Sequence, residues 1–196
     1  LETRGLKYIG EHPLGMCYYS ETKRHAYYNI PKNASMSLRA IFAHNSYTET
    51  NTSHIPIDTL LSIVLRDPVE RFISCVNMYL GTRKTDYLYQ GKQLVRNTNI
   101  DLERRYLKTN DEHFKEQTLY INYVKDFKNR DYFYLKDSTI KDITDYYKLN
   151  IEGIKRTNFK QNSSFKIITH VNKTAIQGIY NKDIDLINKI KFINDA

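Results

Sequence analysis

The chain has 196 residues, of which 40% are hydrophobic and 27% charged, and its net charge at pH 7 is +8. This length suits one domain with a buried core, and no apolar stretch approaches the roughly 20 residues that span a bilayer. Lys and Arg are spread along the whole chain, which favours an anionic ligand or surface. Two cysteines, Cys17 and Cys75, are too few for a disulfide framework or a zinc site, so we expect both to be buried and reduced.

The composition also bears on the source and location of the protein. Asn, Lys, Ile and Tyr are abundant, and AT-rich codons encode all of them, which indicates a microbial or viral source. The chain contains four N-glycosylation sequons, and the first, at Asn33, falls in a loop that we expect to bind a ligand. A glycan there would block the loop, so we expect a cytoplasmic location.

The amino-terminal third predicts strands interrupted by one helix. Residues 16–30 form two Tyr-rich stretches around a polar turn, which is typical of a hairpin or of two successive strands. Residues 37–44 carry apolar side chains at helical spacing, and the polar residues 45–54 are expected to form a loop. The apolar run at residues 60–66 predicts a strand that is buried on both faces.

A helix is predicted to begin directly after this strand. Asp67 can cap it, Pro68 suits the first helical position, and Glu70 stands where a capping-box acid belongs. After this helix, residues 81–110 are polar, basic and rich in tyrosine, without a clear period over most of their length. We expect an insertion there that faces the substrate.

The remaining sequence predicts a helix over residues 112–127, a strand over 131–136, a helix over 138–149 and an amphipathic helix over 182–194. Residues 153–174 are expected to form a loop. Because strands alternate with helices, the expected fold is a single α/β domain over residues 1–196, with a mostly parallel sheet flanked by helices.

The stretch IPKNASMSL, residues 30–38, has the parts of an anion cradle. A strand that ends at Ile30, followed by a helix beginning near Ser35, aims free backbone N–H groups and the positive end of a helix dipole at one point. Lys32 adds a charge, and the hydroxyls of Ser35 and Ser37 add donors. The alternative is an ordinary turn capped by a serine.

A second candidate site follows the buried strand at residues 60–66. Arg66 ends this strand, and Ser74 lies two turns into the next helix, on a face that can look back toward the strand end. An arginine and a serine so placed can hold a second phosphate. Arg71 is expected to brace this motif through carboxylates.

Together these stretches resemble the sulfotransferases that use 3′-phosphoadenosine-5′-phosphosulfate (PAPS), especially the carbohydrate O-sulfotransferase branch. IPKNASMSL is similar to their 5′-phosphosulfate loop, VLRDPVERFIS to their 3′-phosphate motif, and DEHFKEQTLYI to a D-x-H-x-x-x-Q segment found downstream. The resemblance covers residues 27–42, 61–80 and 111–122. It implies the P-loop-like PAPS sulfotransferase fold and transfer of a sulfuryl group to a carbohydrate or glycoconjugate hydroxyl.

The resemblance also implies roles for individual residues. Lys32 would contact the transferred sulfate and neutralise the leaving phosphate, the backbone N–H groups of residues 33–37 would hold the 5′ end, and Arg66 with Ser74 would hold the 3′-phosphate. No metal is required. Donor-binding positions implied by the motifs are Pro31, Lys32, Asn33, Ala34, Ser35, Met36, Ser37, Leu38, Arg66 and Ser74. Asn33 and Met36 depart from the Gly or Thr common in such loops.

The reaction needs a base that takes the proton of the acceptor hydroxyl. His54 lies between the two phosphate motifs and is our first candidate. In several members of the family that the chain resembles, a histidine in this interval acts as the catalytic base. His113, in the third motif, is the rival, and each histidine can also be an ordinary surface residue. For the acceptor, the basic Tyr-rich insertion offers aromatic faces and arginines.

Two other classes of function stay open. A P-loop kinase would carry the pattern G-x-x-x-x-G-K-[ST], which the chain lacks. A non-catalytic protein that binds polyanions or nucleic acid would explain the charge and the aromatic residues, but gives no reason for RDPVERFIS. The sulfotransferase hypothesis explains both motifs and their order, so no nucleic-acid partner is expected.

Overall fold

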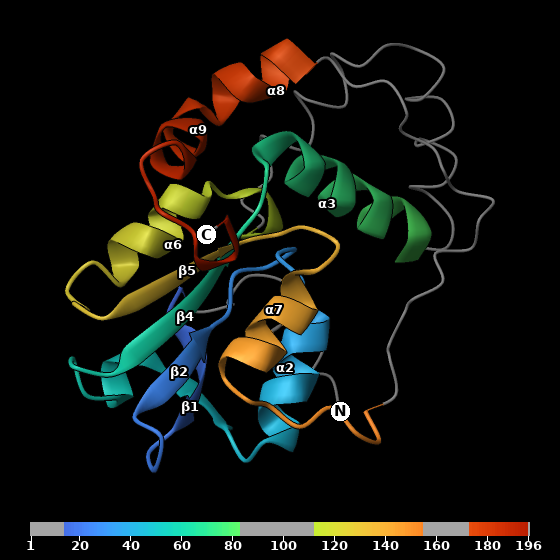
Figure 1. The fold of residues 1–196 in the computed structure, drawn as a ribbon. Coiled ribbons are helices and arrows are strands. Elements are labelled where there is room, and N and C mark those ends of the chain that lie inside the picture. The colour runs from blue at the N-terminus through green and yellow to red at the C-terminus, as the bar shows by residue number, and fades with distance from the viewer. Residues whose placement is uncertain (1–13, 83–111, 155–172, 196) are drawn as a thin grey trace, which may run out of the picture.

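A five-stranded sheet in the order β3-β1-β2-β4-β5 forms the centre of the molecule (Figure 1). The structure is a computed structural model that describes residues 14–82, 112–154 and 173–195. Its strands are β1 (Met16–Ser20), β2 (His25–Tyr28), β3 (Thr48–Asn51), β4 (Leu60–Leu65) and β5 (Arg130–Tyr134). The hairpin and the two later strands that the sequence predicts are therefore present.

The sheet is mixed, so the prediction of a mostly parallel sheet is wrong. β4 pairs in parallel with β2 and β5, whereas β1 pairs antiparallel with both β2 and β3. β3 lies within residues 45–54, which the sequence predicts as a loop. Its sequence, Thr-Glu-Thr-Asn, has no buried residue because β3 is an edge strand, so the alternation that reveals a half-buried strand is missing.

Helices cover both faces of the sheet (Figure 1). They are α2 (Ser35–His44), α3 (Pro68–Thr82), α6 (Gln117–Tyr123), α7 (Thr139–Tyr146), α8 (Lys173–Ile179) and α9 (Asn181–Ile187), with single 3₁₀ turns η1 (Thr52–His54), η2 (Glu112–Phe114) and η4 (Ile193–Asp195). The described residues thus form a single α/β domain, as predicted. None of the helices within the described ranges is long and apolar enough to cross a membrane.

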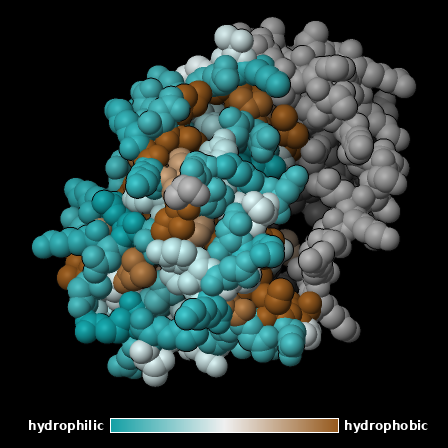
Figure 2. All heavy atoms as spheres, viewed as in Figure 1, coloured by the Kyte–Doolittle hydropathy of each residue, from teal (hydrophilic) through white to brown (hydrophobic). Residues whose placement is uncertain are grey.

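Alternating side chains of the strands fill two separate cores. Tyr28 and Ile63 point to the face covered by α6 and α9, where they pack with Tyr120. Tyr27 and Val64 point to the opposite face, which α2 and α7 cover. The side of the molecule seen in Figure 2 is mostly hydrophilic, and hydrophobic residues gather along α8 and α9. Both cysteines are buried and free, as expected.

The predicted helix over residues 112–127 is broken into η2 and α6. Glu116 has extended backbone angles (φ −55°, ψ 138°), and the buried carboxylate of Asp183 accepts hydrogen bonds from the N–H groups of Gln117 and Thr118. This long-range cap makes α6 begin at Gln117. Helical spacing alone did not reveal the break.

The carboxyl-terminal helix is also shorter than predicted. α9 ends at Ile187, and the chain then runs along β5, where the Asn194 side chain bonds both the N–H and the C=O of Tyr134. These bonds occupy the outer edge of β5. The insertion predicted at residues 81–110, including its candidate acceptor-binding arginines, lies almost wholly outside the described residues.

Candidate functional site

The loop between β2 and α2 has left-handed backbone at two residues that are not glycine. Lys32 has φ 69° and Ala34 has φ 58°. Such conformations cost free energy and persist only where surrounding contacts impose them, and they cluster at functional sites. Turns with left-handed residues also bring successive backbone N–H groups together into concave anion sites. The loop therefore has the backbone of an anion cradle without the glycines of the nucleoside-triphosphate loop.

The first turn of α2 leaves backbone donors unused. The N-cap residue is Ala34, and no side chain in the described ranges caps the helix. The first helical bond runs from Leu38 N–H to Ala34 O (3.1 Å), so within the described chain the N–H groups of residues 35–37 have no acceptor. A serine-capped turn is thus not what the sequence folds into. The free donors and the helix dipole instead favour an anion at this point.

Asn33 anchors the loop to the sheet. Its side chain is fully buried, and its amide nitrogen donates to Val64 O (2.8 Å) and to Gln117 Oε1 (2.6 Å). Its backbone N–H donates to Ile30 O (3.3 Å), so within the described chain the run of N–H groups without an acceptor starts at Ala34. The side chain of Leu38, on α2, is buried in the core between this helix and the sheet.

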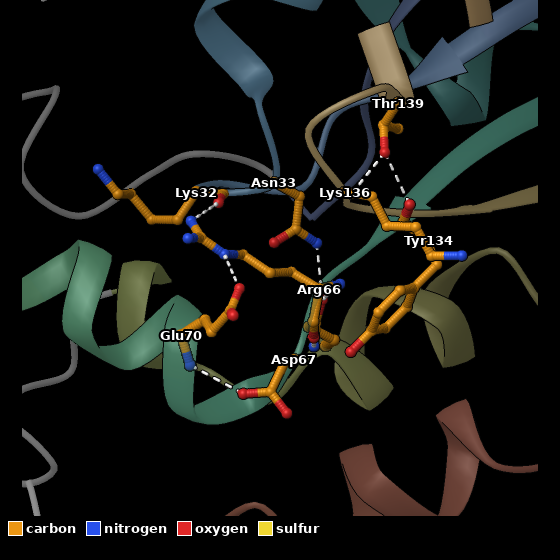
Figure 3. A network of polar contacts seen from close by, with 9 residues as sticks. Lys32, Asn33, Arg66, Asp67, Glu70, Tyr134, Lys136 and Thr139 are labelled. Atoms are coloured by element: carbon orange, nitrogen blue, oxygen red, sulfur yellow. Dashed lines mark hydrogen bonds and ion pairs between the residues drawn. The ribbon is translucent and has the colours of Figure 1, made fainter. Parts of the chain in front are cut away.

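Arg66 lies directly beside this loop. Its guanidinium donates to Lys32 O (3.3 Å) and faces the Glu70 carboxylate at 3.6 Å, as Figure 3 shows. The Glu70 side chain is 62% exposed, so this ion pair adds little to stability. Glu70 N–H donates to Asp67 Oδ1 (2.9 Å), which confirms that Asp67 caps α3. Cap and ion pair together hold Arg66 against the cradle.

Arg71 is buried and binds backbone carbonyls instead of the predicted carboxylates. Only 2% of its surface is exposed. Its Nε donates to Pro31 O (3.1 Å) and its Nη1 to Lys115 O (2.7 Å), while its buried Nη2 has no partner in the described part of the chain. Arg71 thus ties the cradle loop to the segment before α6. It also leaves a buried positive charge that no described carboxylate binds.

The three basic residues influence one another. Burial lowers the pKa of the Lys32 ammonium, the nearby Cys75 thiol opposes this shift, and the charges of Arg66 and Arg71 lower the pKa further. Positive charges brought this close with one exposed acidic partner repel each other, and an anion between them relieves the repulsion. The charge of the site therefore favours a negatively charged ligand.

The structure places the other predicted site residues, Ser74, His113 and His54, differently with respect to Lys32, Arg66 and Arg71. Ser74 is half-buried on α3 and makes no hydrogen bond to the described residues. His113 is half-buried, and its backbone carbonyl accepts from Cys75 Sγ (2.8 Å), which joins it to the Lys32 neighbourhood. His54 is exposed at the end of η1. It follows β3, which is two strand spacings, about 10 Å, from β2.

Two residues of this site have roles that the sequence did not reveal. Gln117 belongs to the third motif, but nothing local indicates that its side chain bonds the cradle. Asp183 lies 66 residues further along and has no motif at all. Among the described residues, no group of three or more His, Cys, Asp or Glu side chains is placed to share a metal ion.

Comparison with known proteins identifies no relative of this chain. The chain matches no protein-family model, no curated protein and no solved structure. Its function is therefore inferred from the geometry and chemistry of this site.

Proposed function

We propose that the protein transfers a sulfuryl group from PAPS to a hydroxyl of a carbohydrate or glycoconjugate. One observation carries this proposal: Lys32, Arg66 and Arg71 gather at the free amino-terminal end of α2, where the described chain offers them a single, exposed carboxylate. The strand, cradle loop and helix, with parallel β4 alongside, also support a P-loop-like arrangement.

The site suits a ligand with two separate anionic groups. In Figure 3 the Lys32 side chain extends away from the Arg66 guanidinium, so the two charges serve different positions. Lys32 and the free N–H groups of residues 34–37 fit the 5′ end of PAPS, while Arg66 and Ser74 fit its 3′-phosphate. ATP has no 3′-phosphate and would leave the second position unused.

Each residue has a definite task in this chemistry. PAPS supplies the sulfuryl group, whose bond to the 5′-phosphate oxygen breaks as a bond to the acceptor oxygen forms. The Lys32 ammonium stabilises the negative charge that develops on the leaving oxygen, and its lowered pKa favours giving up a proton there. A histidine takes the proton of the acceptor hydroxyl.

Calorimetric titration with 3′-phosphoadenosine-5′-phosphate (PAP), AMP and ATP tests the proposal. We expect PAP to bind at least tenfold more tightly than either other nucleotide. Arg66→Ala should weaken PAP binding by about 2 kcal/mol, the scale of a lost charge-assisted hydrogen bond. Arg24→Ala is the matched control, because Arg24 is exposed and pairs with Asp58 on the surface. Equal binding of the three nucleotides would reject the assignment and favour a general polyanion binder.

The base is identified by comparing His54→Ala with His113→Ala. Position along the fold favours His113, whose backbone carbonyl bonds Cys75 near Lys32, although His54 is the first candidate from the sequence. Loss of the base should reduce turnover by about 100-fold or more while PAP affinity stays unchanged. PAPS turnover with a panel of unsulfated polysaccharides measures this effect. If both variants keep wild-type turnover, neither histidine is the base.

A further inference from the structure

The side chain of Gln117 joins the two loops that carry the basic residues. Its Nε2 donates to Arg66 O (2.8 Å), and its Oε1 accepts from Arg66 N–H (3.0 Å) and from Asn33 Nδ2 (2.6 Å). Arg66 follows β4, and Asn33 lies in the cradle loop. One fully buried amide therefore satisfies both backbone groups of Arg66 and holds the cradle beside them.

The backbone of Gln117 is itself fixed from the other side. Its N–H donates to Asp183 Oδ2 (2.9 Å), while the N–H and hydroxyl of Thr118 both donate to Asp183 Oδ1 (2.8 Å). Asp183 is fully buried on α9. Asp183 on α9 thus holds the backbone of Gln117, while its side-chain amide binds both loops.

We propose that Gln117 is a positioning residue that sets the separation of the two anion-binding loops, and thereby the preference for a nucleotide phosphorylated at both its 3′ and 5′ positions. This inference rests on the proposed function. It does not place Gln117 in contact with the nucleotide: among the described residues, the hydrogen bonds of its side chain go to Asn33 and Arg66.

The preference follows from how two contacts on one ligand combine. Once the 5′ end is bound, the 3′-phosphate meets Arg66 at a high effective concentration, provided that the spacing of the two positions matches the ligand. If the two loops can move apart, this advantage falls. AMP lacks the 3′-phosphate and binds only the cradle, so its affinity falls much less when the loops move apart. A merely structural defect would lower the affinity for both nucleotides by the same factor.

The test measures the ratio of PAP affinity to AMP affinity in Gln117→Met, which keeps the volume of the side chain and removes its three hydrogen bonds. We expect the ratio to fall at least fivefold relative to wild type. Thr118→Val is the matched control: it loses a hydrogen bond to the same carboxylate of Asp183 but touches neither loop, so its ratio should stay within twofold of wild type.

The outcomes separate this inference from the function on which it rests. If wild-type protein prefers PAP and Gln117→Met keeps that preference, the inference alone is overturned. If wild-type protein shows no preference, the proposed function fails and the inference fails with it. Should Gln117→Met not fold, Asn33→Ala breaks the same link from the cradle side while leaving the bonds to Arg66 intact, and an unchanged ratio in that variant overturns the inference.

Discussion

Replacing Lys32 with alanine is expected to lower PAPS turnover by about 100- to 10,000-fold, the range for loss of an acid or of electrostatic stabilisation in a transition state. The fold should survive, because the Lys32 side chain makes no hydrogen bond to the described residues and extends away from the Arg66 guanidinium in Figure 3. Alanine already occupies the left-handed conformation two positions later, at Ala34, so the backbone strain hardly changes.

Turnover is measured as PAP release with the panel of unsulfated polysaccharides, and thermal unfolding checks the fold. Lys141→Ala is the control, since this lysine is exposed on α7 and forms an ion pair with Asp145 one turn away. It should keep wild-type turnover. A Lys32→Ala protein that turns over as fast as wild type would exclude the lysine from the chemistry and remove the main support for a sulfotransferase.

Local signals predicted the parts of the site that depend on neighbouring residues. The buried run before Arg66, the cap at Asp67 and the helix that starts near Ser35 each have a pattern of a few adjacent residues, and all three are present. The overall α/β class followed from the order of these elements. The strand β3 was missed because an exposed edge strand needs no apolar alternation.

Long-range contacts decided what local patterns left open. Asn33 bonds a residue 84 positions away, and Arg71 bonds a carbonyl 44 positions away. Because such partners meet only after the sheet and helices have packed, no spacing in the sequence reveals them. The same applies to Asp183, whose buried carboxylate starts α6 and fixes Gln117. The residues of the loops were thus predictable, but their anchoring was not.

Acid is expected to destabilise the protein through His25, which lies far along the chain from the proposed base. Burial lowers the pKa of this imidazole from 6.5 to about 4, and the charge of Lys23 acts in the same direction. The ring stacks on Tyr147 (4.1 Å), its Nδ1 bonds the Tyr47 hydroxyl (2.7 Å), and its buried Nε2 has no partner within the described residues. The charged imidazole carries a proton on both ring nitrogens, so its Nε2–H would have no acceptor among the described residues.

Between these two pKa values the unfolded chain binds a proton that the folded chain does not, so the free energy of unfolding falls as the pH drops from about 6.5 to about 4. His25 alone lowers the free energy of unfolding by about 3 kcal/mol over this range, and it has no such effect above pH 6.5. Urea unfolding from pH 7.5 to pH 4 measures it. His25→Gln should lose about 3 kcal/mol less than wild type over this range, whereas His44→Gln, at an exposed position, should behave as wild type. Identical pH profiles for His25→Gln and wild type would mean that the buried imidazole accepts a proton in the folded state, and that the packing of Tyr47 and Tyr147 around it adapts to the charge.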